Sequence, residues 1–130
     1  MYSERGSAAV EMALVLPVLL IVFLAIAEFG NLMFTRLTLT NAAMMGARAG
    51  ITALTATDAI AQAEGTAAAS LPTGASAIAT IIEIPAPRRI QVDVSYSYEP
   101  ILGNALFSLL KTSGPGTWDL AETAVMSFNN

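Results

Sequence analysis

Two carboxylates, Glu11 and Glu28, bracket the most apolar part of the chain. Between them, residues 12–27 carry no charge and no side chain that can form a hydrogen bond. A carboxylate in such surroundings is costly to bury unless a cation and hydrogen bonds accompany it. These positions therefore suggest that each carboxylate forms an ion pair with a cationic group. The element that contains the carboxylates must place them where such a group can reach them.

The other acidic residues do not form a catalytic set. Asp93, Glu99, Asp119 and Glu122 are scattered over segments that read as strands, where solvation is the ordinary role of a carboxylate. The chain contains no Cys and no His, which excludes thiol nucleophiles, imidazole bases, disulfides and the usual zinc sites. It also has no glycine-rich phosphate loop and no calcium-loop spacing. We therefore predict a protein that is not an enzyme and that uses no cofactor and no metal.

The composition suits a membrane-tethered or densely packed subunit. Hydrophobic residues make up 55% of the 130 residues and charged residues only 12%, about half the usual share in soluble domains. The net charge is -4, and the six Lys and Arg residues are not gathered into a patch. Nucleic acid is not an expected partner, because contacts with phosphates need clustered cations.

The apolar stretch has two direct interpretations. Residues 12–27 would form about 24 Å of helix, and the small residues 7–10 extend this to the roughly 30 Å of a hydrocarbon core. The first interpretation is a single transmembrane helix from Ser7 to Ala27 that tethers an outer interaction domain. The second is a signal peptide, in which Arg5 supplies the positive charge and cleavage after Ala27 releases a secreted domain.

Glu11 favours a third interpretation. Residues 6–11 read Gly-Ser-Ala-Ala-Val-Glu, and a Gly followed five residues later by Glu at the start of an apolar helix is the processing signature of type IV pilin-like proteins. Cleavage after Gly6 would create an ammonium group on Ser7. Glu11 could then neutralise the ammonium group of a neighbouring subunit inside an apolar filament core. The simpler alternative is that Glu11 lies in a first helical turn, where a negative charge suits the helix dipole.

Three motifs in the first 50 residues closely resemble the TadE-like family. They are residues 5–17, the segment Ala27-Glu-Phe-Gly30 and residues 38–50, which follow one another in order. This family comprises pilin-like and pseudopilin proteins of the tight adherence secretion and pilus system.

The resemblance implies a precursor in the bacterial inner membrane and an extracellular filament after assembly. A dedicated prepilin peptidase and the pilus assembly machinery are the implied partners, together with identical or homologous pilin-like subunits. Gly6 is implied to be the cleavage-site glycine, with Ser7 following it, and Glu11 to be the carboxylate that aids subunit registry. Whether such a chain is a major or a minor subunit stays open.

We expect one helix from about residue 7 to about residue 50. Pro17 removes a backbone hydrogen bond from it, so a kink or a locally extended turn is expected over residues 13–17. Pro17 and Glu28 therefore join Glu11 as candidates for a role in assembly or registry.

The second half of this helix is amphipathic. Gly46 and Gly50 have the Gly-x-x-x-Gly spacing that permits close packing, although Gly50 could also simply end the helix. Arg48 could pair with an acid of the outer domain or of a neighbour, or it could be a solvated surface residue. The apolar face that we expect to cover the globular domain comprises Phe29, Leu32, Met33, Leu37, Met44, Ala47 and Ile51.

The remainder predicts a small sheet and a second helix. Asp58 is the expected N-cap of an alanine-rich helix that ends near Ala69. Strands are expected over residues 77–84, 90–99 and 118–128, the second with strict alternation of apolar and polar residues, and residues 101–111 could form one or two helical turns. The predicted fold is α+β, a long N-terminal helix on three antiparallel strands. We divide it into a leader (1–6), a transmembrane or filament-core helix (7–28) and an extracytoplasmic domain (29–130).

Overall fold

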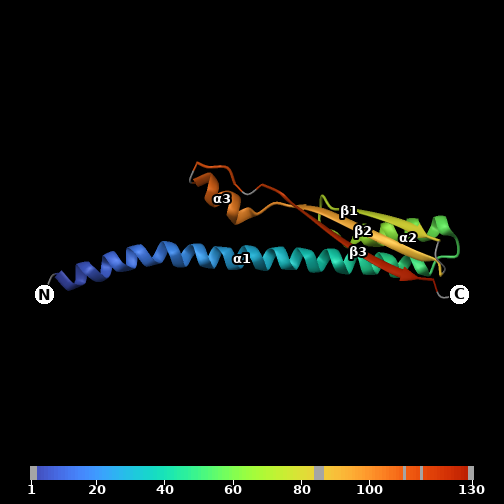
Figure 1. Ribbon diagram of the computed structural model, residues 1–130, viewed down its shortest axis with the longest axis horizontal. Coiled ribbons are helices and arrows are strands. Elements are labelled where there is room, and N and C mark those ends of the chain that lie inside the picture. Colours follow the sequence, from blue (N-terminus) through green and yellow to red (C-terminus); the bar gives the residue numbers. More distant parts are fainter. Residues whose placement is uncertain (1–2, 84–86, 110, 115, 129–130) are drawn as a thin grey trace. The chain divides into compact units, whose positions relative to one another are not determined.

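The residues that the structure describes form three helices and three strands. The predicted α+β class is confirmed (Figure 1). The structure is a computed structural model that describes residues 3–83, 87–109, 111–114 and 116–128. The elements are, in order, α1 (Ser3–Ile51), α2 (Ala56–Ala69), β1 (Ser76–Ile82), β2 (Arg89–Tyr98), α3 (Ile101–Leu109) and β3 (Trp118–Ser127).

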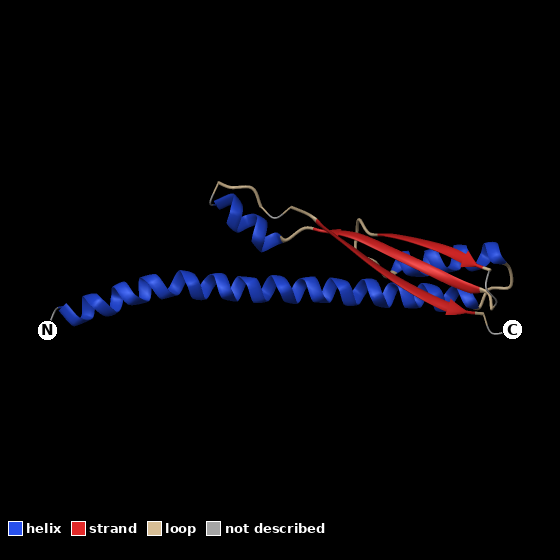
Figure 2. Ribbon diagram, in the orientation of Figure 1, coloured by secondary structure: helices blue, strands red, loops and turns tan. Residues whose placement is uncertain are grey.

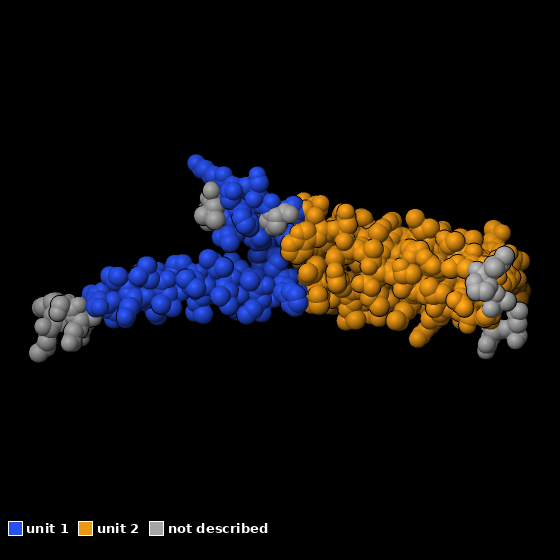
Figure 3. Space-filling model, in the orientation of Figure 1, with its two compact units in different colours: residues 1–31, 100–116 blue, residues 32–99, 117–130 orange. Residues whose placement is uncertain are grey.

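These elements form two compact units, which Figure 3 colours separately. The first, which we call the anchor unit, comprises residues 1–31 and 100–116, so it contains the first part of α1 together with α3. The second, the sheet unit, comprises residues 32–99 and 117–130 and contains the rest of α1, α2 and all three strands. The sequence did not suggest that residues 100–116 would group with the apolar half of the helix.

The sheet unit is built on an antiparallel sheet in the order β1-β2-β3 (Figure 2). Val92 in the central strand pairs with Ala79 on one side and Ala124 on the other. The alternation of β2 behaves as predicted, since Ile90, Val92 and Val94 are buried. The opposite face of the sheet is polar, and on it the Asp93 carboxylate accepts hydrogen bonds from Gln91 and Thr123. One face of the sheet therefore belongs to the hydrophobic core, and the other face is exposed to solvent.

Helix α2 packs on this core through alanines at four-residue spacing. Ala59, Ala63 and Ala67 are fully buried, in one cluster with residues of α1 and β2. The predicted N-cap was wrong. Thr55 is the N-cap, and its hydroxyl oxygen accepts a hydrogen bond from the Asp58 backbone N–H at 3.2 Å, which places Asp58 in the first turn. A threonine in extended conformation suits this position because its hydroxyl can reach an unpaired helix N–H.

Helix α1 is continuous over its whole length. It begins before the expected residue 7 and ends one residue after the expected residue 50. We expected a kink or a locally extended turn at Pro17. Residues 13–17 are helical, so the extended turn does not occur. Flanking turns that are rich in apolar, helix-compatible side chains can hold a helix together around one lost hydrogen bond.

The strands agree with their predicted ranges to within two residues at the ends that are described, and residues 84–86 lie outside the described part.

Candidate functional site

The candidate processing motif lies on the exposed surface of α1. Gly6, Ser7 and Glu11 are helical and exposed, and a Cβ atom at Gly6 would meet nothing within 4 Å. No ion pair or hydrogen bond joins Glu11 to another residue in the described part of the chain. This arrangement leaves the Glu11 carboxylate accessible to a group on another molecule.

The apolar half of α1 is covered very little by its own chain. Every residue from Gly6 to Phe23 is exposed, including large side chains such as Met12, Leu14, Leu19 and Phe23. The helix is long and apolar enough to cross a membrane. Burying each large aliphatic side chain gains roughly 1.5–3 kcal/mol, so this surface has a strong drive to enter lipid or to pack against protein.

Glu28 has an intrachain role that the sequence did not reveal. Its carboxylate oxygens accept hydrogen bonds from the backbone N–H groups of Ile101 at 3.2 Å and Leu102 at 2.9 Å, the first two residues of α3. The preceding residue, Pro100, has no side-chain acceptor that could cap this helix. In the sequence, the only indication was that the helix starting at Ile101 has no capping residue of its own. That indication did not identify Glu28 as the residue that caps it.

Gly46 and Gly50 lie on the face of α1 that packs against α2. A Cβ atom at Gly46 would lie 2.7 Å from the Ala63 carbonyl oxygen and 2.9 Å from the Ala67 Cβ. A Cβ atom at Gly50 would lie 3.0 Å from the Ala59 carbonyl oxygen and would overlap the Ile90 side chain. These distances leave no room for a methyl group, so the two glycines allow the helix backbones to touch. Between them, Arg48 is exposed.

The buried face of α1 in the sheet unit differs from the one that we predicted. The buried residues are Leu39, Ala42, Ala43, Gly46, Ala47 and Gly50. Of the predicted face, Ala47 is buried, Leu32 and Ile51 are partly buried, and Phe29, Met33, Leu37 and Met44 are exposed. Small residues occupy the inner face because the alanines of α2 lie directly against it, which leaves the large side chains on the outside.

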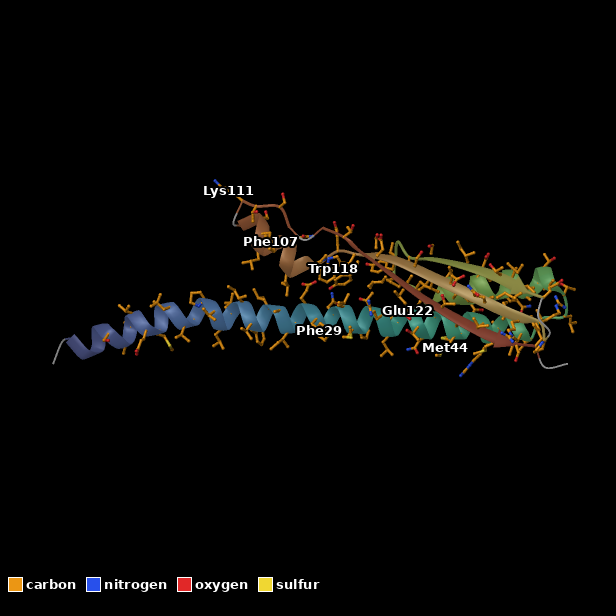
Figure 4. All side chains as sticks on the ribbon, in the orientation of Figure 1. Phe29, Met44, Phe107, Lys111, Trp118 and Glu122 are labelled. Carbon is orange, nitrogen blue, oxygen red and sulfur yellow. The ribbon has the colours of Figure 1, made fainter. Side chains whose placement is uncertain are left out.

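A stripe of large apolar side chains therefore remains uncovered on the part of α1 that belongs to the sheet unit. We call it the outer stripe and define it as Met33, Phe34, Leu37, Met44 and Met45, of which Met44 is marked in Figure 4. Phe34 is 69% exposed and Leu37 is 59% exposed. Exposed apolar surface of this extent usually marks a site of protein or membrane interaction.

The arrangement provides exposed apolar surfaces that are suited to association. Within the described ranges, no group of three or more acidic residues is placed to hold a metal ion. The polar clusters of the sheet, such as Ser97 with Asp119, are hydrogen-bonded pairs on the exposed face.

The comparison with protein families agrees with the sequence motifs. The family described as TadE-like protein matches residues 6–48, which confirms the resemblance over the segment that carries the processing motif, the apolar stretch and most of the inner face of α1. The match supports an association with the tight adherence pilus and an amino-terminal helix suited to a membrane. No curated protein and no solved structure matches the chain.

Proposed function

Because residues 6–48 carry the TadE-like sequence, we propose that this chain is a structural subunit, a pilin or pseudopilin, of a tight adherence pilus. Its apolar helix is held in the bacterial inner membrane before assembly. Prepilin peptidase cleaves after Gly6, and the mature chain, beginning at Ser7, packs through α1 against identical or homologous subunits in an extracellular filament.

The outer stripe is the observation that carries this proposal. The outer stripe, within residues 33–45, follows the apolar run of residues 12–27 in the sequence. A bilayer core is only about 30 Å thick and is already filled by the preceding apolar half. Lipid therefore does not account for the exposed side chains of Phe34, Leu37 and Met44, whereas a neighbouring subunit packed along α1 would bury them.

The single-span alternative lacks an explanation for this stripe. A protein that only tethers an outer domain needs apolar surface over the length of the span and gains nothing from exposed methionine and phenylalanine beyond it. A charge such as Glu11, placed within the apolar length, is likewise a burden for a permanent anchor but useful for finding register against identical helices.

Disulfide cross-linking tests this packing directly, because the natural chain contains no Cys. Leu37→Cys, on the outer stripe, is expected to cross-link to a cysteine on the same face of a second copy in assembled material. Leu54→Cys is the matched control, because Leu54 is 100% exposed in the loop after α1. Equal cross-linking of the two variants, or none from Leu37→Cys in assembled material, would contradict the proposal.

The mass of the native amino terminus distinguishes the three histories of the chain. A processed pilin begins at Ser7, a tethered protein or a pilin that retains its leader begins at Met1, and a secreted domain begins at Glu28. We expect Ser7, because Gly6 and Glu11 have the spacing that the processing signature requires.

A further inference from the structure

Helix α3 is joined to the apolar half of α1 by hydrogen bonds, and the two helices line a common apolar hollow. The Glu28 carboxylate accepts the two hydrogen bonds at the start of α3. Beyond this point, Leu102, Gly103 and Leu106 of α3 line one small hollow together with Ile21, Leu24 and Ala25 of α1. Helix α3 therefore lies beside the Glu28 end of the segment that is suited to a bilayer.

The surface of α3 that faces away from α1 is also free of charge. It presents Ile101, which is 67% exposed, Phe107, which is 38% exposed, and the small residues Ala105 and Ser108. In the sequence from Pro100 to Trp118, the only charged residue is Lys111. Within α3 only Asn104 and Ser108 have polar side chains, and exposed isoleucine and phenylalanine are unfavourable in water.

Some backbone groups at each end of α3 have partners within the chain and do not need water. Glu28 serves the N–H groups of Ile101 and Leu102, and Pro100 has no N–H group to satisfy. At the other end, the Ser108 carbonyl accepts from the Lys111 N–H at 3.1 Å and the Phe107 carbonyl from the Thr112 N–H at 3.0 Å. In hydrocarbon, an unsatisfied backbone group costs several kcal/mol, so these partners suit a helix placed in lipid.

The length of α3 limits how it can meet a bilayer. Nine residues form about 14 Å of helix, roughly half of a hydrocarbon core, so α3 cannot cross it. Lys111 follows the helix in a left-handed conformation, φ 54°, and its side chain is exposed. Figure 4 marks Phe107 on α3 and Lys111 just beyond the end of that helix. A lysine at the end of an apolar helix can extend its ammonium group to lipid phosphates.

We propose that α3 is an interfacial membrane helix, which lies in the leaflet at the Glu28 end of the span, packed on Ile21, Leu24 and Ala25, with its exposed side chains among the lipid chains. The proposal rests on the membrane insertion of α1 proposed above. In the membrane-bound form, α1 would then span the bilayer and α3 would lie at its surface. The Glu28 carboxylate would hold α3 against α1.

Fluorescence quenching by brominated lipid tests the position of α3 in the full chain. The protein has one Trp, so Trp118→Phe provides a silent background. Phe107→Trp and, in a second variant, Ile101→Trp are placed in this background and reconstituted in phosphatidylcholine–phosphatidylglycerol vesicles. We expect about a twofold loss of emission from both reporters with lipid brominated on its acyl chains, because an interfacial helix is buried about 5–10 Å.

Two control reporters separate this inference from its premise. Phe23→Trp lies in the span and must be quenched by brominated lipid if α1 is inserted, whereas Leu54→Trp in the exposed loop must respond only to aqueous acrylamide. If Phe23→Trp is quenched while both α3 reporters respond only to acrylamide, α3 is in water and the inference fails although insertion stands. If Phe23→Trp is not quenched, both proposals fail.

A second copy of the chain is the other occupant that could cover α3. In that case the α3 reporters would be shielded from acrylamide without quenching by brominated lipid, and the shielding would fall as protein is diluted at constant lipid. That result would also overturn the inference.

Discussion

Single residues decide how closely the helices of the sheet unit approach each other. The Gly46 backbone lies against the Ala63 carbonyl oxygen and the Ala67 side chain, and neither neighbour can move independently of α2. Helix α2 also contains a glycine, Gly65, at which a Cβ atom would meet nothing within 4 Å. The two glycines therefore have opposite roles, one for close packing and one without any steric requirement.

Gly46→Ala is expected to destabilise the sheet unit by about 1–3 kcal/mol, the usual cost of overpacking a core. Gly65→Ala, the matched control, is expected to stabilise it by about 0.5–1 kcal/mol, since alanine loses less backbone freedom within a helix. Urea unfolding in detergent, followed by circular dichroism, measures both. A neutral Gly46→Ala variant would show that α1 and α2 do not pack as described.

Glu11 has no intrachain partner in the described structure, which fits a role between subunits. We expect Glu11→Ala to insert into membranes as the natural chain does but to assemble poorly, because the registry charge is lost. Membrane fractionation and filament yield, measured on the same cells, separate the two effects. Normal filaments from this variant would rule out the registry role.

At the scale of elements, α3 depends on a carboxylate that is more than 70 residues away in the chain. Hydrogen bonds to a charged group contribute about 1.5–3 kcal/mol, so Glu28→Ala is expected to accelerate amide exchange at Ile101 and Leu102 by roughly tenfold or more. Glu99→Ala is the control, because Glu99 is exposed and close to α3 in sequence. Hydrogen–deuterium exchange in lipid nanodiscs measures the exchange rates in both variants. Equal rates at Ile101 and Leu102 in the two variants would show that Glu28 does not cap α3.

The elements themselves were largely predictable from local pattern. The alternation from Ile90 to Tyr98 specifies a strand with one buried face, and the uninterrupted apolar composition of residues 12–27 specifies a helix. Pro17 did not break that helix, because one lost hydrogen bond is outweighed by the helical turns on either side.

The buried face of α1 was not predictable from hydrophobicity alone. Large apolar residues are usually assigned to the core, but the core here is lined by Ala43, Gly46 and Ala47 because α2 presents alanines at the same spacing. The four-residue spacing of Ala59, Ala63 and Ala67 was the signal that a second small-residue face was present. The contact of Glu28 with α3 has no local signature, since it joins distant segments through backbone N–H groups.

At the scale of the whole molecule, the chain buries small side chains and exposes large ones along the same helix. Ala42, Ala43 and Ala47 are buried in the sheet unit, whereas the outer stripe of Met33, Phe34, Leu37, Met44 and Met45 is exposed. A polar substitution there is expected to leave the isolated chain folded and to prevent association. We propose that other copies of the chain complete this hydrophobic burial in the assembled state.

Leu37→Lys tests this organisation. It is expected to unfold at the same urea concentration as the natural chain, because Leu37 is exposed, and to reduce filament yield at least tenfold, because a charge would be buried against a neighbour. Leu54→Lys introduces the same charge at the exposed loop and should assemble normally. Loss of the fold in Leu37→Lys, or equal assembly of the two variants, would contradict a subunit interface at the outer stripe.

Imaging of surface filaments from cells that produce this chain, at a resolution that traces helices, tests the proposed subunit role most directly. We predict filaments that contain this chain from Ser7 onward, with the apolar half of α1 in the filament core and Phe34, Leu37 and Met44 against a neighbouring subunit. Filaments that lack the chain, while it remains in the membrane fraction with Met1 in place, would contradict the account.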